Sequence, residues 1–201
     1  SDLEMEEIGI TLITGASLEF TTDNDLAKNN ALYRRMPFQA DAGLRNKINE
    51  GDIYFIDQHL SETSELLENK HLPQLDLAII EATYIDENGN IIPTTSVGNS
   101  ATFAKLASKI IIEINTSIPL NFKGIHDIAL HEAYPNRKPV AITKPDSRIG
   151  QDFIAIDPEK VIGLVYTNLS DSSAQVTAPD AKTAAIGQHL VAFFESEIEA
   201  G

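Results

Sequence analysis

The sequence predicts an α/β fold with a mostly parallel sheet flanked by helices. Two observations lead to this prediction. Apolar runs rich in Ile and Val alternate along the chain with amphipathic helical segments, and turn or cap residues separate them. Strands that read as continuous apolar runs are typical of parallel sheets, which carry helices on both faces. The clearest of these strands are Ile10–Ala16, Leu75–Ile85, Lys109–Asn115 and Val161–Asn168.

The elements between the first two strands are predicted from caps and periodicity. Asp41 is a helix N-cap and Gly51 a stop, so a helix lies between them. The spacing of apolar residues predicts helices over Asp23–Met36 and Ser61–Leu72, and a short strand over Ile53–Gln58. The basic stretch "RRMP" would then be the end of the first helix. Its alternative role is contact with a carboxylate or phosphate.

A hairpin is expected after the long second strand. "DENGN" contains Asn88-Gly89, which suits the positive φ angles of a type I′ turn. Ile91–Val97 is the returning strand, and its Pro93 predicts an edge position or an early end. Helices are expected over Asn99–Ser108 and Asp180–Gly201. The pattern is looser between residues 116 and 160.

Composition limits the class of function. The chain has 201 residues, enough for one domain or one and a half, and a formal net charge of −15. Such a charge argues against nucleic acid and against anionic membrane surfaces as partners. There is no cysteine, hence no disulfide and no thiolate nucleophile. No signal peptide or membrane span is visible, and we expect a cytoplasmic protein.

Residues that could carry chemistry are few. Glu81, at the end of a buried strand, could be a base or nucleophile, or a structural carboxylate bonded to a loop. Glu113 has the same ambiguity. His126 and His131 are five residues apart, which is not the spacing of metal ligands on one helical face, and we expect no metal site. The usual glycine-rich nucleotide motifs and the G-x-S-x-G elbow are absent.

The stretch "PTTSVGNSATF" is a strand-to-helix turn with one glycine. Gly98 can adopt backbone angles that other residues avoid, or admit a ligand close to the main chain. Asn99 or Ser100 could cap the following helix and leave free N–H groups for an anion or a carbonyl oxygen. A plain capped turn explains these residues equally well.

Several stretches together carry a family resemblance: "ITLITGASL", "RRMPFQADAGLRNKIN", "FIDQHLSETSELL", "AIIEATYIDENGNIIPTTSVGNSATFAKLA", "GIHDIAL" and "RIGQDFIAIDPEKVIGLV". The sequence resembles the acetyl-CoA hydrolase/transferase family of class I CoA-transferases, in particular its succinyl-CoA:acetate CoA-transferase branch. The resemblance is collinear from about Ile10 to Gly201. It implies a CoA-transferase-like (NagB/RpiA-type) domain.

The resemblance also implies a longer protein with two similar α/β halves and an active site between them. Residues 1–201 would be the N-terminal domain, truncated at both ends and lacking the C-terminal catalytic domain. In this family a glutamate attacks the acyl-CoA thioester and forms a glutamyl-CoA intermediate. That glutamate belongs to the C-terminal half, so no catalytic residue is assigned here and Glu81 becomes structural. We expect this fragment to be inactive alone.

The N-terminal half is expected to form the carboxylate end of the cleft. Its substrate-binding candidates are Gly15, Gln39, Gly43, Gly98 and Asn99. The resemblance also implies that some relatives have a larger residue where Gly43 stands. Glycine at this position would leave room for a bulkier acid substrate. The partners implied are an acyl-CoA and a short-chain carboxylate, with coenzyme A as substrate and no cofactor. A homodimer is expected at full length.

Other functions stay open at this point. A hydrolase of the same family would use water as the acceptor, and a non-catalytic module could hold a small anion with the "SVGNS" turn. A sugar-phosphate isomerase of related architecture is disfavoured because the family resemblance lies elsewhere.

Overall fold

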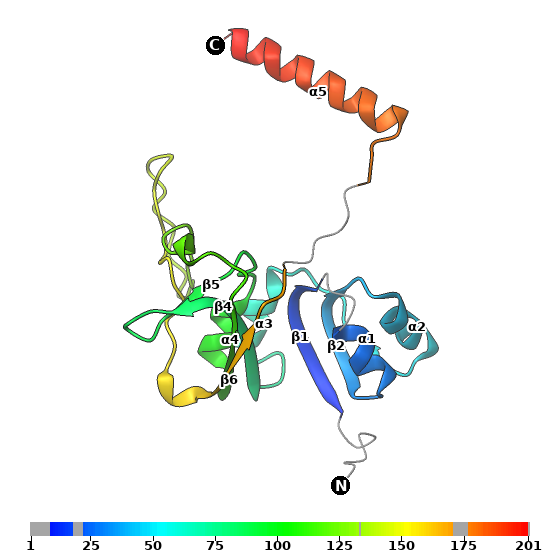
Figure 1. Cartoon of the computed structure of the whole chain (residues 1–201), viewed down its shortest axis with the longest axis vertical. Helices are drawn as coiled ribbons and strands as arrows, with labels where there is room; N and C mark the ends of the chain where they lie inside the picture. The colour runs from blue at the N-terminus through cyan, green and yellow to red at the C-terminus, as the bar shows by residue number, and fades with distance from the viewer. Residues whose placement is uncertain (1–8, 18–21, 133, 171–176, 201) are drawn as a thin grey trace.

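The computed structural model describes residues 9–17, 22–132, 134–170 and 177–200, and these residues form two β-sheets (Figure 1). The first sheet is parallel, with strand order β1-β2-β3: β1 (Ile10–Ser17), β2 (Leu32–Gln39) and β3 (Tyr54–Phe55). The second has the order β5-β4-β6-β7: β4 (Leu77–Ile85), β5 (Ile91–Pro93), β6 (Lys109–Asn115) and β7 (Val161–Thr167). Only β5 is antiparallel to its neighbour. The α/β prediction with mostly parallel pairing is confirmed.

Five α-helices accompany the sheets in the described part of the chain: α1 (Thr22–Lys28), α2 (Ala42–Glu50), α3 (Glu62–Glu68), α4 (Ser100–Leu106) and α5 (Ala181–Ala200). Two 3₁₀ turns, Leu120–Phe122 and Pro158–Lys160, lie between β6 and β7. None of the described helices is both long and apolar enough to cross a membrane.

The main core lies on one face of the four-stranded sheet. Ile80 of β4 and Ile112 of β6 pair side by side and are fully buried. Ala101 and Ala104 of α4 pack against them, and these small side chains let the helix lie close to the strands. A second cluster, around Leu44 of α2, lies beside the three-stranded sheet.

The predicted caps of α2 are confirmed, whereas the first helix is shorter than predicted. The Asp41 carboxylate accepts a 2.7 Å hydrogen bond from the Leu44 amide, and Gly51 ends α2 at φ +86°. Helix α1 ends at Lys28 because Asn30, at φ +52°, turns the chain into a strand.

The prediction that "RRMP" ends a helix is therefore wrong. Arg35 lies within β2, is fully buried, and makes two hydrogen bonds of 2.9 and 3.0 Å to the Asp23 carboxylate. Its guanidinium also donates to the Met36 carbonyl. This side chain is used inside the fold, so it offers no free charge to an anion.

The hairpin between β4 and β5 is confirmed, but it is not a type I′ turn. Gly89 has φ +81°, whereas Asn88 does not have a positive φ. The Asp86 carboxylate accepts hydrogen bonds from the amides of Asn88 and Asn90, at 2.9 and 2.8 Å. The bond from the Asn90 amide is the main cause that lowers the pKa of Asp86, and the Asn90 side chain and Asn88 amide add to it. As predicted, β5 is an edge strand that ends at Pro93.

The loose region between β6 and β7 folds back on itself. Both Asp127 carboxylate oxygens accept from the Ile149 amide, and one also accepts from the Gly150 amide at 2.7 Å. Arg148 donates to the carbonyls of Gly124 and His126. A β-carbon on Gly150 would lie 2.1 Å from the Ile128 carbonyl oxygen, so only glycine fits this crossing.

Candidate functional site

The turn that follows β5 meets the carboxyl end of β1. Gly98 has φ +45°, a conformation that favours glycine. A β-carbon placed on Gly98 would lie 3.9 Å from the Cα of Gly15. Two of the predicted substrate-binding residues, far apart in the sequence, therefore lie side by side where the two sheets adjoin (Figure 1).

Asn99 holds this turn to α3 instead of capping α4. Its side-chain oxygen accepts a 3.1 Å hydrogen bond from the Ser64 hydroxyl, and its amide nitrogen donates to the Leu60 carbonyl at 3.3 Å. The Ser64 hydroxyl lies 2.9 Å from the hydroxyl of Thr102. Asn99 occupies the N-cap position of α4 but makes no side-chain capping bond there. The prediction that its side chain caps α4 is wrong, because the amide is used between helices.

A cavity of about 340 Å³, the turn pocket, opens beside this contact. Polar groups from α3, the turn, α4 and the segment after β6 share its lining with small and apolar residues: Ser64, Val97, Gly98, Asn99, Ala101, Thr102, His126, Asp127, Ile128, Ala129 and Leu130. The His126 ring nitrogen Nε2 lies 3.2 Å from the Pro93 carbonyl oxygen. The turn is thus fixed from both sides.

The chemistry of the turn pocket suits binding better than nucleophilic attack. Among the described residues of its lining, Asp127 is the one carboxylate, and both oxygens of that group accept hydrogen bonds from backbone amides. The hydroxyls of Ser64 and Thr102 and the amide of Asn99 are uncharged groups that can orient a ligand. This arrangement can hold a small polar group.

The remaining two predicted residues lie on the side of the three-stranded sheet. Gln39 ends β2 and pairs with Ser17 of β1, two residues beyond Gly15. Its side-chain oxygen is buried and has no hydrogen-bond partner among the described residues. A buried polar atom without a partner is a place where a ligand group or a water can bind.

Gly43 lies in the first turn of α2. A β-carbon there would approach the Asn24 side-chain oxygen to 2.6 Å and that of Asp41 to 3.2 Å. A side chain at position 43 would have to displace the Asn24 side chain, which lies where α1 contacts α2. The structure brings Gly15, Gly98 and Asn99 together, and places Gly43 against this helix contact.

Glu81 is held by hydrogen bonds behind the turn. One carboxylate oxygen accepts from the Thr94 hydroxyl and the other from the Asn115 side chain, both at 2.8 Å. Its neighbour across the parallel strands, Glu113, accepts from the Thr167 hydroxyl at 2.9 Å. Both carboxylates connect strand ends, which agrees with a structural role for Glu81.

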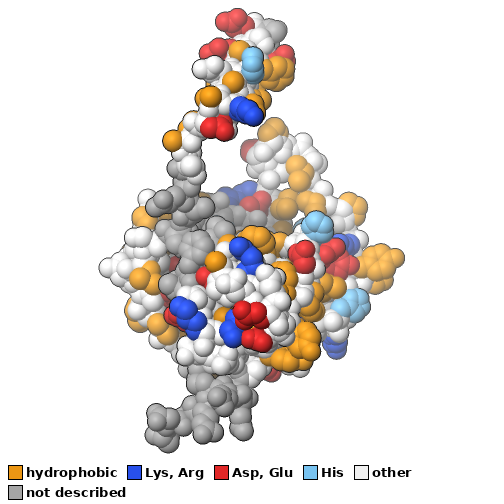
Figure 2. Space-filling view, turned by 90° about the vertical axis from the view of Figure 1, so that its right-hand side faces the viewer, with side chains coloured by type: hydrophobic (Ala, Val, Ile, Leu, Met, Phe, Trp, Pro, Cys, Tyr) orange, Lys and Arg blue, Asp and Glu red, His pale blue; other side chains and the backbone are white. Residues whose placement is uncertain are grey.

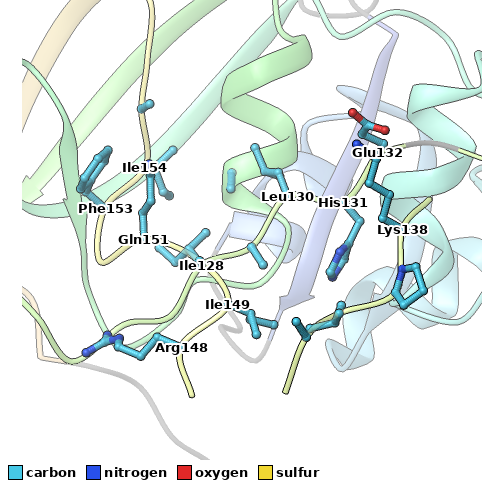
Figure 3. A pocket seen from close by; sticks show the side chains of 17 residues that line it. Ile128, Leu130, His131, Glu132, Lys138, Arg148, Ile149, Gln151, Phe153 and Ile154 are labelled. Atoms are coloured by element: carbon cyan, nitrogen blue, oxygen red, sulfur yellow. The ribbon is translucent and has the colours of Figure 1, made fainter. Parts of the chain in front are cut away.

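A larger cavity, of about 660 Å³, lies within the segment between β6 and β7 (Figure 3). Its walls are mostly apolar and include Ile128, Leu130 and Phe153, with Arg148 also in the lining. The Arg148 guanidinium is bonded to the carbonyls of Gly124 and His126. None of the five predicted substrate-binding residues lines this cavity.

Comparison with known proteins decides the family. Residues 2–166 match the model of the acetyl-CoA hydrolase/transferase N-terminal domain. The chain belongs to this family. It is 38% identical to succinyl-CoA:acetate CoA-transferase from Clostridium kluyveri, over 98% of this chain and 36% of that protein. It is 41% identical to acetyl-CoA hydrolase from Schizosaccharomyces pombe, over 94% of this chain and 37% of that protein.

Other members of the family show the same partial coverage. Propanoyl-CoA:succinate CoA transferase from Escherichia coli is 33% identical over 96% of this chain and 39% of that protein. The chain thus spans a little over a third of the length of these curated relatives. A 4-hydroxybutyrate CoA-transferase from Porphyromonas gingivalis has a similar fold, with a TM-score of 0.50, 14% identity and coverage of 86% of this chain and 38% of that one.

Sequence reasoning found Gly98 and Asn99 but missed the other residues of the turn pocket, among them Ser64 and His126. Ser64 is one of several polar residues in "SETSELL", and nothing in that run marks its hydroxyl as the contact to Asn99. From the sequence pattern, His126 is considered only as a metal ligand, although it stands in the "GIHDIAL" stretch that carries the family resemblance. The presence of His126 in that stretch is the sequence signal that could have identified it as a site residue.

Proposed function

We propose that this chain is the N-terminal domain of a CoA-transferase. The enzyme would exchange CoA between acetyl-CoA or succinyl-CoA and a short carboxylic acid. We further propose that the turn pocket and the adjoining strand ends form the carboxylate end of its cleft. The complete enzyme is expected to be a cytoplasmic homodimer that uses coenzyme A as a substrate and needs no other cofactor.

The proposed reaction proceeds through a glutamyl-CoA intermediate. A glutamate outside this chain attacks the thioester carbonyl, expels CoA thiolate and forms a mixed anhydride. The thiolate then attacks the glutamyl carbonyl and releases the first carboxylate. An acceptor carboxylate then attacks the glutamyl-CoA thioester, expels CoA thiolate and forms a second mixed anhydride. The thiolate attacks the acceptor carbonyl of this anhydride, which gives the new acyl-CoA and frees the glutamate. The share of this domain is to bind and orient the carboxylates, which lowers the entropic part of the barrier.

The observation that carries the proposal is the contact of Gly98 with Gly15. Two residues without side chains adjoin the hydroxyls and amide of the turn pocket, and this leaves space for a small ligand next to uncharged donors. The hydrogen-bonded state of Glu81 and Asp127 supports a nucleophile from another part of the enzyme.

The proposal is tested with the purified 201-residue chain. We expect it not to transfer CoA from acetyl-CoA to succinate, whereas the longer protein that contains it transfers CoA at ordinary enzymatic rates. Transfer by the 201-residue chain alone would contradict the assignment of the nucleophile. Binding of succinate without turnover by either protein would favour a small-anion-binding module instead.

Acetyl-CoA hydrolysis is the second candidate. It is favoured by the names of relatives such as acetyl-CoA hydrolase from Saccharomyces cerevisiae, 39% identical over 97% of this chain. The two activities differ in whether water reaches the glutamyl thioester. Consumption of acetyl-CoA by the longer protein is therefore measured with and without an acceptor acid. A strong increase with the acid supports the transferase, and equal rates support the hydrolase.

A further inference from the structure

One face of the four-stranded sheet is left open by the part of the chain that the structure describes. Side chains alternate between the two faces of a strand, so the neighbours of the buried Ala78 and Ile80 point away from α4. Ile79 is 64% exposed and Leu77 44%. Register places both uncharged and charged residues on this open face. The uncharged ones are Leu77, Ile79, Ile111, Gly163 and Val165, and the charged ones are Glu81, Lys109 and Glu113. Parallel sheets normally have both faces covered, so this face needs a partner element.

Helix α5 carries an apolar stripe that nothing covers in the described structure. Its apolar residues recur every three or four positions, and all are more than half exposed: Ile186, Leu190, Val191, Phe194 and Ile198. Figure 2 shows the helix clear of the main body, with hydrophobic side chains on its surface. A helix with such a stripe is stabilised by burying it.

We propose that α5 docks across the open face of the four-stranded sheet of its own chain, antiparallel to the strands. Chain order supports this orientation. Strand β7 ends at Thr167 on the carboxyl edge of the sheet, so the helix that follows begins at this edge and runs back over the strands. The thirteen residues 168–180 between them reach up to roughly 40 Å when extended, which is ample for the return.

Charge complementarity supports the same orientation. Glu197 follows Leu190 by seven residues and Phe194 by three, so it lies on the apolar stripe near the end of the helix. Lys109 begins β6, pairs with Leu77 and is exposed on the open face. Antiparallel docking brings the Glu197 carboxylate to the Lys109 ammonium group. The reverse orientation would instead place Glu197 beside the carboxylate of Glu113.

The dimensions of the two surfaces also agree. From Ile186 to Glu197 the helix rises about 16 Å, and β6 extends about 20 Å from Lys109 to Asn115. Gly163 on the sheet and Gly187 on the stripe have nothing within 4 Å of a built β-carbon. Gly163 lies on the edge strand β7 and Gly187 near the start of the stripe, so neither adds a side chain that would hold the helix away from the sheet.

A second copy of the chain could offer the same sheet face to α5. Within one chain, however, the short connection gives the helix a high effective concentration at the sheet, of millimolar order. Intramolecular docking is therefore favoured at ordinary protein concentrations.

Cysteine cross-linking tests the proposal, because the chain contains no cysteine of its own. The test variant combines Ile79→Cys with Leu190→Cys on the stripe. The matched control combines Ile79→Cys with Gln188→Cys, which is two residues away and therefore on the opposite side of α5. Both sheet and helix positions are exposed, so the variants should fold. Each is treated with a short bifunctional maleimide and analysed by intact mass and denaturing gels.

We expect the test variant to form an intramolecular cross-link at least tenfold faster than the control. Lys109→Glu or Glu197→Lys in this background should slow the cross-link, and both together should restore it. A cross-linked dimer as the main product would show a second copy as the occupant and overturn the proposal. Equal, slow cross-linking in both variants would overturn it as well.

Discussion

Arg35 is a charged residue whose side chain is buried and has its hydrogen-bond partners inside the fold. Its guanidinium is fully buried in β2 and forms a two-bond contact with the carboxylate of Asp23 in α1. The sequence shows Arg34-Arg35 as a basic pair but not the burial of one member. That burial depends on Asp23, twelve residues away, which local patterns do not connect to it.

Substitution of Arg35 tests this buried ion pair. Arg35→Met should lower the free energy of unfolding by roughly 3–5 kcal/mol, because the Asp23 carboxylate stays buried without a partner. Urea unfolding followed by circular dichroism measures the effect. The control is Arg45→Met, an exposed arginine of α2, for which a change within about 0.5 kcal/mol is expected. Equal losses in the two variants would refute this account of Arg35.

Asp86 makes the stability of the hairpin depend on pH. Its pKa is lowered from the usual 3.8, mainly by the hydrogen bond from the Asn90 amide. The ionised carboxylate is therefore favoured in the folded state. The resulting stability is present above the pKa of the unfolded chain and is lost as pH falls through the folded pKa.

We therefore expect Asp86→Asn to reduce the urea midpoint at pH 7 and to match the parent chain below the folded pKa of Asp86. Midpoints measured from pH 7 down to strongly acidic pH show this convergence. Glu87→Gln, at the exposed neighbouring position, should give a nearly constant difference across the range. A difference for Asp86→Asn that persists at the lowest pH would contradict the assignment.

At the scale of elements, local sequence signals predicted those strands and helices whose bounds depend on local residues. Strand β6 has the predicted bounds because Lys109–Asn115 is rich in isoleucine, a β-branched residue that favours strands. Helix α2 was predicted because Asp41 and Gly51 are caps. Strand β2 was missed because "ALYRRM" also fits helical spacing, and its pairing with β1 and β3 overrides that local preference.

Glu81 links three elements by hydrogen bonds. Substitutions at this position can show whether its carboxylate is structural or acts as a nucleophile. Its two oxygens bind Thr94, before the turn, and Asn115, at the end of β6. In the longer protein, Glu81→Gln should keep CoA transfer within a few-fold of the parent, because the Thr94 hydroxyl can accept from the new amide. Glu81→Leu should destabilise by about 1–3 kcal/mol, since it leaves two donors unpaired.

Steady-state CoA transfer and thermal unfolding of both variants check this prediction. A loss of activity of several orders of magnitude in Glu81→Gln, with an unchanged melting temperature, would identify Glu81 as a reacting group instead.

At the scale of the whole molecule, the candidate site is assembled from segments distant in the sequence. Ser64 of α3, the turn at Gly98 and the segment at His126 line one cavity in the folded chain. Residue patterns alone left two alternatives for the turn, a site for an anion or carbonyl oxygen and a plain capped turn. The family resemblance supplied Gly15, Gly98 and Asn99 as candidates, whereas Ser64 and His126 required three-dimensional structure, since their contacts are long-range hydrogen bonds.

The central claim is that the contact of Gly15 with Gly98 borders the carboxylate-binding end of a CoA-transferase cleft. Gly15→Val tests it most directly, because a β-carbon there meets nothing within 4 Å and valine suits a strand. The variant should fold normally and fill the space that a carboxylate would occupy. Thr11→Val, near the start of the same strand, is the control.

The decisive measurement is the steady-state kcat/KM of the longer protein for the acceptor acid. We predict a decrease of roughly tenfold or more for Gly15→Val, with no change for Thr11→Val and similar melting temperatures for both. An unchanged kcat/KM for the acceptor in a stably folded Gly15→Val variant would contradict the account.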